Sequence, residues 1–192
     1  MARSATTTHA CFGPVDGASS TARSAAETAL SAARSSFSTG RSLLRPVELR
    51  DLRFLRDMLR HAYYWRLDED RERPVYRYVQ NWGRAGDAGV IALEGPHPAG
   101  AAWYRLFDQR APGFGFVDER TPELTIAVVP SRRGKGTGKE MLTALLDRAR
   151  ADGYDAVSLS AAHEQTEYYG HFGFEAVRET PYAVTMQLAL NS

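Results

Sequence analysis

The chain has 192 residues, of which 43% are hydrophobic and 10% aromatic, and its formal net charge is +1. This size allows one domain with an appendage, and the near-neutral charge argues against general binding to nucleic acid or to a membrane surface. No apolar run approaches the roughly 18 residues that a membrane span requires. Cys11 is the only cysteine, which excludes intramolecular disulfides and a cysteine metal cage and favours a cytoplasmic location.

The N-terminal segment, residues 1–41, is rich in Ala, Ser and Thr and poor in large apolar side chains. Such a segment cannot bury enough surface to offset its chain entropy, so we expect disorder there and a folded domain over residues 42–192. Its Ser- and Arg-rich, acid-poor composition is also typical of an organelle transit peptide. A targeting segment and an unstructured or over-extended N-terminus both remain compatible with the sequence.

Hydrophobic periodicity sharpens from Ser42 onward and predicts the order β-α-α-β-β-β-α-β-α-β-β. One helix carries Leu49, Leu52, Leu55 and Leu59 on one side, and a second follows Pro74 and ends near Gly83. A longer helix over 138–153 has a buried stripe formed by Met141, Leu142, Leu145, Leu146 and Ala149. The expected strands cover residues 42–45, 89–94, 100–107, 123–129, 156–161, 174–179 and 182–190.

This order combines a run of antiparallel strands with a single β-α-β unit around residues 123–161. It predicts an α+β protein of three layers with a mixed sheet, not a doubly wound fold. The long connection over residues 108–122 holds Phe114 and Phe116 between glycines. That connection is either a mobile wall over a substrate cleft or a loop with a small apolar cluster of its own.

The stretch "SRRGKGTGKE", residues 131–140, lies between a predicted buried strand and a helix. It is not a P-loop, because Arg133 stands where that motif needs its first glycine and Glu140 where it needs a hydroxyl. The dinucleotide fingerprint also fails, because Lys139 or Met141 occupies the place of its last glycine. What remains is Arg-x-x-Gly-x-Gly at a helix N-terminus, where unpaired N–H groups and basic side chains favour a pyrophosphate.

Two segments in this order resemble the GCN5-related N-acetyltransferases (GNAT): "AVVPSRRGKGTGKEMLTALL" is similar to their motif A, and "EYYGHFGFEAV" to their C-terminal motif. The resemblance covers residues 42–192 and implies a splay between the two parallel strands. It also implies acetyl-coenzyme A as co-substrate and no metal. The implied coenzyme-binding residues are Val128, Val129, Arg133, Gly134, Lys135, Gly136, Thr137, Gly138 and Lys139.

The resemblance further implies catalytic roles. Tyr169 is the expected acid that protonates the coenzyme sulfur, whereas Tyr168 should point about 100° away on a helix. Glu123 is the expected base acting through water, although it could equally be an ordinary strand-end charge, and Asp118 and Glu119 are reserves. A main-chain N–H of Val128 or Val129, at a bulge that splays the strands, should stabilise the carbonyl oxygen.

Together these features predict an acetyl-CoA-dependent N-acetyltransferase that transfers an acetyl group to a primary amine by direct attack in a ternary complex. No nucleophilic cysteine lies in the folded part, which argues against a covalent route. The acceptor is a small molecule or a peptide, and the acids of "RLDED" could attract a cationic one. The alternative is a non-catalytic acyl-CoA sensor or interaction module, and a monomer and a homodimer are both compatible with the sequence.

Overall fold

The computed structural model describes residues 42–64 and 75–191, and the predicted extension 1–41 and the acidic run 66–70 lie outside them. Helices labelled η are 3-10 helices. The elements are β1 (Leu43–Pro46), η1 (Leu49–Asp51), α2 (Leu52–Ala62), η3 (Val75–Tyr78), β2 (Ala88–Glu94), β3 (His97–Arg105), β4 (Glu123–Val128), η4 (Pro130–Arg132), α3 (Thr137–Ala151), β5 (Ala156–Ala161), η5 (His163–Gln165), α4 (Thr166–Gly170), β6 (Glu175–Glu179) and β7 (Val184–Ala189).

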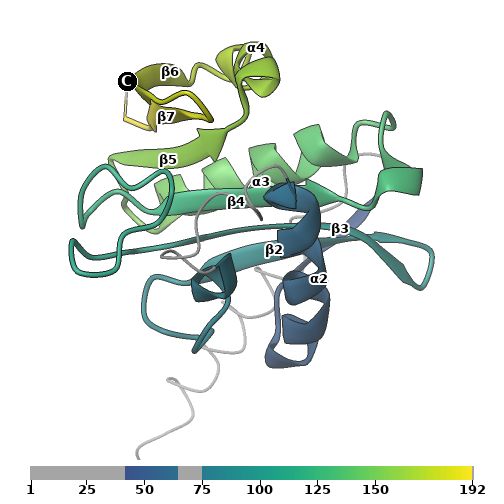
Figure 1. Ribbon diagram of the computed structural model, residues 1–192. Helices are drawn as coiled ribbons and strands as arrows, with labels where there is room; N and C mark the ends of the chain where they lie inside the picture. The colour runs from purple at the N-terminus through teal and green to yellow at the C-terminus, as the bar shows by residue number, and fades with distance from the viewer. Residues whose placement is uncertain (1–41, 65–74, 192) are drawn as a thin grey trace, which may run out of the picture. The chain divides into compact units, whose positions relative to one another are not determined.

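Seven strands form one sheet in the order β1-β2-β3-β4-β5-β7-β6 (Figure 1). Every neighbouring pair is antiparallel except β4 and β5, which are parallel and connected through α3. The mixed sheet with a single β-α-β unit confirms the predicted α+β class.

The sheet has a helix layer on each face. The predicted stripe of α3 packs on one face, where Met141, Leu142 and Leu145 join a core that extends to β5 and β7. On the other face, α2 buries Leu55 and Leu59 against β2, β3 and β4. Because side chains alternate along a strand, each strand supplies both layers, which produces the predicted three-layer arrangement.

Two helix predictions need correction. The helix expected after Pro74 is only the 3-10 turn η3, because Asn81 adopts a left-handed φ of 53° and Gly83 one of 100°, which no α-helix accommodates. Leu49, expected on the buried side of the first helix, is 67% exposed. It belongs to η1, where the tighter 3-10 turn shifts the phase of its side chain away from the buried face of α2.

The parallel strands β4 and β5 separate almost as soon as they meet. Their register contains one pair, Glu123 with Ser158, next to a bond from the Ser158 N–H to the Pro122 carbonyl (3.0 Å). This confirms the predicted splay. The register of β4 with β3 continues without a shift from Glu123 to Val128, so the bulge expected near Val128 is absent from that span.

The hydrogen-bond pattern of β4 leaves two N–H groups facing the gap. The Val129 N–H donates to the Ala99 carbonyl of β3 at 2.9 Å. N–H groups of successive residues in an antiparallel strand point to opposite sides. The N–H groups of Ile126 and Val128 therefore point away from β3, toward the space where β4 and β5 diverge.

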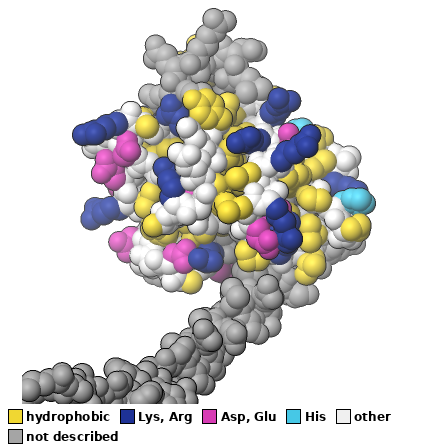
Figure 2. All heavy atoms as spheres, turned by 90° about the horizontal axis from the view of Figure 1, so that it is seen from below, with side chains coloured by type: hydrophobic (Ala, Val, Ile, Leu, Met, Phe, Trp, Pro, Cys, Tyr) yellow, Lys and Arg dark blue, Asp and Glu magenta, His cyan; other side chains and the backbone are white. Residues whose placement is uncertain are grey.

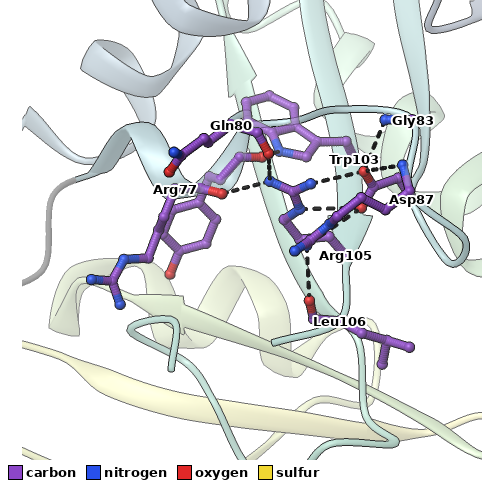
Figure 3. A network of polar contacts seen from close by, with 9 residues as sticks. Arg77, Gln80, Gly83, Asp87, Trp103, Arg105 and Leu106 are labelled. Carbon is purple, nitrogen blue, oxygen red and sulfur yellow. Dashed lines mark hydrogen bonds and ion pairs between the residues drawn. The ribbon is translucent and has the colours of Figure 1, made fainter. Parts of the chain in front are cut away.

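Arg105, at the end of β3, forms a buried ion pair and also holds the segment around η3 (Figure 3). Arg105 is fully buried and donates through Nε and Nη2 to the Asp87 carboxylate, at 3.1 and 2.8 Å. Its Nη1 donates to the carbonyls of Arg77 (2.5 Å) and Gln80 (2.9 Å). These bonds use four of the five N–H donors of the guanidinium and fix the backbone on either side of Tyr78, a residue that reaches the site described below.

The surface is mixed in character. On the face shown in Figure 2, basic, acidic and apolar side chains are interspersed, as expected from the near-zero net charge. No helix within the described ranges is long and apolar enough to cross a membrane.

Candidate active site

The gap between β4 and β5 opens into a cleft of about 470 Å³. The glycine segment and the start of α3 close one end, α4 forms a side wall, and the end of α2 closes the other end. The lining residues are His61, Ala62, Tyr63, Leu124, Thr125, Ile126, Ala127, Val128, Arg132, Arg133, Gly134, Gly136, Thr137, Gly138, Lys139, Leu159, Ser160, Gln165, Tyr168 and Tyr169.

The glycine segment turns the chain sharply into α3. Gly134 and Gly136 have φ values of 77° and 87°, a left-handed conformation that strains any side chain, and Gly136 is the N-cap of α3. The first intrahelical bond runs from the Glu140 N–H to the Gly136 carbonyl (3.1 Å). The N–H groups of the three residues between them precede this bond and form the positive end of the helix at the cleft.

Gly138, at the start of α3, keeps the cleft open between β4 and α4. A Cβ atom at this position would lie 3.4 Å from the Tyr168 hydroxyl and 3.7 Å from Cγ2 of Val128. A methyl group therefore fits, whereas a longer side chain would fill the space between β4 and α4. The open turn, the N–H groups and the basic residues fit a ligand that carries a diphosphate.

Most residues predicted to bind the coenzyme line this cleft, and two do not. The lining members are Val128, Arg133, Gly134, Gly136, Thr137, Gly138 and Lys139. Val129 turns its N–H to Ala99, and Lys135 forms an ion pair with Glu94 at 3.0 Å. Arg132, one of the basic residues of this stretch expected to add charge around the pyrophosphate, lines the cleft and also contacts Glu94.

The sequence that forms most of this cleft matches a family model. The Acetyltransferase (GNAT) family model aligns with residues 52–174, which include β4, the glycine segment, α3 and α4. The chain belongs to the GNAT family.

Solved structures of acetyltransferases share this fold at low sequence identity. The yncA structure from Salmonella typhimurium, which contains its cofactor acetyl-CoA, has a TM-score of 0.58 and 21% identity, covering 79% of this chain and 95% of that one. The PaiA N-acetyltransferase from Thermoplasma acidophilum, in complex with coenzyme A, has a TM-score of 0.56 and 13% identity, covering 77% and 98%. A ribosomal-protein-alanine N-acetyltransferase from Brucella melitensis has 0.56 and 20%, covering 77% and 99%.

A search of curated proteins finds no match at a significant level.

Both tyrosines of α4 face the cleft of this GNAT domain, which corrects the expectation that Tyr168 points elsewhere. Tyr168 approaches Gly138, and Tyr169 is buried with its ring against Phe174 (5.9 Å between centroids). The two adjacent rings contact each other edge to face, with 5.1 Å between their centroids, so both can line the same cleft. Burial raises the pKa of Tyr169 above the ordinary phenol value, with a smaller contribution from Tyr168.

Glu123 is buried, with 1% of its surface exposed, and does not line the cleft. The Tyr78 hydroxyl donates to its Oε1 at 2.5 Å, and so does the Gly115 N–H at 2.7 Å. A Cβ on Gly113 would collide with the same carboxylate, so the glycines of the 106–122 loop allow the backbone to approach it closely. Phe114 is buried in this loop, which agrees with the apolar-cluster interpretation rather than with a mobile wall.

Hydroxyl groups connect Glu123 to the cleft. Tyr63 lines the cleft, bonds to Thr125 through its hydroxyl (3.1 Å), and interacts with Tyr78 at a centroid distance of 4.9 Å. Burial and the charge of Glu123 raise the pKa of both Tyr63 and Tyr78. Both phenols therefore stay protonated at neutral pH, where each can accept one proton while it donates another.

The reserve carboxylates lie elsewhere. Asp118 accepts the N–H groups of Arg120 and Thr121, and Glu119 accepts that of Gln109. Neither lines the cleft.

His61, Ser160 and Gln165 line the cleft from three different elements and were not among the predicted site residues. Each is an ordinary polar residue in its local sequence, so only the packing of α2 and α4 against the open sheet reveals it. Within residues 42–64 and 75–191, His, Cys, Asp and Glu side chains do not gather in any group of three that could hold a metal ion.

Proposed function

We propose that this protein is an acetyl-CoA-dependent N-acetyltransferase that acetylates a primary amine by direct attack in a ternary complex. The observation that carries the proposal is the cleft between β4 and β5, with the glycine turn at one end and Tyr169 on its wall. Two acetyltransferase structures of the same fold contain acetyl-CoA or coenzyme A, which supports this choice of co-substrate. We assign the activity to the cytoplasm because the chain has a single cysteine.

The chain supplies groups for binding the coenzyme. The N–H groups at the start of α3, with Arg133 and Lys139, would hold the diphosphate. The N–H groups of Ile126 and Val128 face the gap between the strands and are the main-chain donors for an acyl carbonyl and for amides of the pantetheine arm. The acyl-CoA supplies an activated thioester.

We assign the role of base to Glu123 and the role of acid to Tyr169, two residues buried beside the cleft. The acceptor ammonium must lose a proton before its nitrogen attacks, because an ordinary amine is mostly charged at neutral pH. Glu123 takes up that proton through the Tyr63 and Tyr78 hydroxyls, which stand between the carboxylate and the cleft. As the C–N bond forms and the C–S bond breaks, Tyr169 donates its proton to the departing thiolate.

Two Gly138 variants test coenzyme binding. Gly138→Leu should abolish binding of coenzyme A in calorimetry, with an unchanged circular dichroism spectrum, because its side chain fills the cleft. Gly138→Ala is the matched control and should bind within about threefold of the native protein, since its methyl group makes only ordinary contacts. Equal affinity in all three proteins would refute the placement of the coenzyme.

An amine panel tests catalysis. The panel contains small primary amines and peptides with a free N-terminus. Thiol release from acetyl-CoA should require the protein and should occur with one of these two classes of acceptor. Coenzyme binding without thiol release from any member of the panel would favour the non-catalytic sensor.

A further inference from the structure

Glu94, the last residue of β2, contacts two cations of the glycine segment. Its Oε2 accepts from Nη1 of Arg132, and its Oε1 accepts from Nζ of Lys135 at 3.0 Å. Both contacts join residues some forty positions apart, so they connect the β2–β3 turn to the glycine segment. The two cations lower the pKa of Glu94, which keeps the carboxylate ionised at neutral pH.

These contacts divert positive charge from the cleft. Lys135 belongs to the segment that was predicted to bind the coenzyme, yet it does not line the cleft, and its ammonium group faces Glu94. Arg132 lines the cleft while its guanidinium is paired with the same carboxylate. Glu94 therefore neutralises part of the charge that an anionic ligand would meet.

The ion pairs of Glu94 with Arg132 and Lys135 are exposed enough for the two cations to exchange Glu94 for another anion. The side chains of Arg132, Glu94 and Lys135 are 35%, 37% and 45% exposed. Exposed ion pairs contribute little because water competes for both partners. The diphosphate of the coenzyme carries two negative charges and four non-bridging acceptor oxygens, whereas a carboxylate carries one charge and two oxygens, so the diphosphate can displace Glu94 from either cation.

We propose that Glu94 competes with the phosphate groups of the coenzyme for Arg132 and Lys135, and so limits how tightly the coenzyme is held. This inference rests on the proposed function, since it requires a phosphate-bearing ligand at the glycine segment. Glu94 touches no reacting atom, and its effect is on coenzyme affinity and release.

Calorimetry with coenzyme A measures this competition. Glu94→Gln should bind coenzyme A about threefold more tightly or better in about 50 mM salt, because it removes the competing charge and keeps the shape. The gain should shrink in about 500 mM salt, where screening weakens exposed charges. Pantetheine, which has no phosphate, should bind both proteins equally.

Asp147→Asn is the matched control. It removes one negative charge and breaks an exposed pair with Arg150 on α3, away from the cleft lining. Its affinity for coenzyme A should stay within about twofold of the native value. An equal gain in this variant would show a long-range charge effect and overturn the competition proposal.

A double variant tests whether Glu94 acts through Lys135. In a Lys135→Gln background, Glu94→Gln should lose at least about half of its effect on the binding free energy, because one of the two disputed cations is gone. An undiminished effect, or weaker binding by Glu94→Gln in the native background, would overturn the proposal. A native protein that fails to bind coenzyme A would refute the proposed function itself, whereas native binding with no gain in Glu94→Gln refutes only the role of Glu94.

Discussion

The two ends of the β2–β3 hairpin both carry ion pairs, and the pairs differ in burial. At one end, Arg105 and Asp87 are almost completely buried, and the guanidinium also bonds to two carbonyls (Figure 3). At the other end, Glu94 pairs with Arg132 and Lys135 in partial contact with water. The first group cannot exchange partners without unfolding its surroundings, whereas the second can. An ion pair is structural when its groups are buried and their hydrogen bonds are made within the protein, and it is available to a ligand when its groups are in contact with water. The types of charged residue matter less.

The largest expected effect tests the buried end. Asp87→Asn leaves the Arg105 guanidinium buried without its counter-charge and should reduce the free energy of unfolding in urea by about 3–5 kcal/mol. Arg84→Gln is the control, because Arg84 is half exposed and reaches Asp87 only at 3.8 Å. It should cost less than about 1 kcal/mol. Similar losses in the two variants would remove the distinction between the hairpin ends.

Glu123 sharpens the comparison, since it is buried like Asp87 but lies beside the cleft. Glu123→Gln should lower turnover about a hundredfold, the scale of a lost general base. Stability should change less than in Asp87→Asn, because an amide still accepts from Tyr78 and Gly115. Thiol-release kinetics and urea unfolding measure the two effects. Full turnover with reduced stability would make Glu123 a purely structural residue.

The neighbouring tyrosines of α4 offer a smaller effect. Tyr169→Phe should lower turnover about tenfold with unchanged affinity for coenzyme A, since only the donated proton is lost. Tyr168→Phe should instead alter the affinity for coenzyme A, because the Tyr168 hydroxyl lies near Gly138. The raised pKa of Tyr169 keeps its hydroxyl protonated, so its ionisation should not reduce native turnover below about pH 10. Equal turnover in Tyr169→Phe and native protein would exclude Tyr169 as the acid.

The smallest effect belongs to the exposed end of the hairpin. Glu94→Gln should change the free energy of unfolding by no more than about 0.5 kcal/mol, because its partners are already solvated. Urea unfolding beside Asp87→Asn measures this directly. A loss as large as that of Asp87→Asn would mean that both ends are structural.

The sequence predicted the parts of this structure that depend on local pattern. The stripe of α3, the boundaries of β5 and the glycine turn at Gly136 all follow from spacing and backbone preference. The prediction of a second helix after Pro74 was wrong because Asn81 adopts a left-handed conformation, which an α-helix does not accommodate. Composition does not reveal that conformation.

The position of individual side chains around the cleft depends on long-range packing. The burial of Glu123 requires the glycines of the 106–122 loop to lie against it, and the appearance of His61 in the cleft requires α2 to end beside β4. Lys135 was expected at the coenzyme because it belongs to the motif, but a carboxylate forty-one residues earlier holds it. No local pattern contains these contacts.

The single register pair between β4 and β5 has a practical consequence. Beyond it, the amide hydrogens of Ile126 and Val128 point into a space where, among the described residues, no strand pairs with β4. Their deuterium exchange with solvent should therefore slow when a ligand with carbonyl groups lies along β4, while the amide of Val129, already bonded to Ala99, serves as an internal reference. Exchange at these three positions would reveal occupancy of the sheet opening before any acceptor is known.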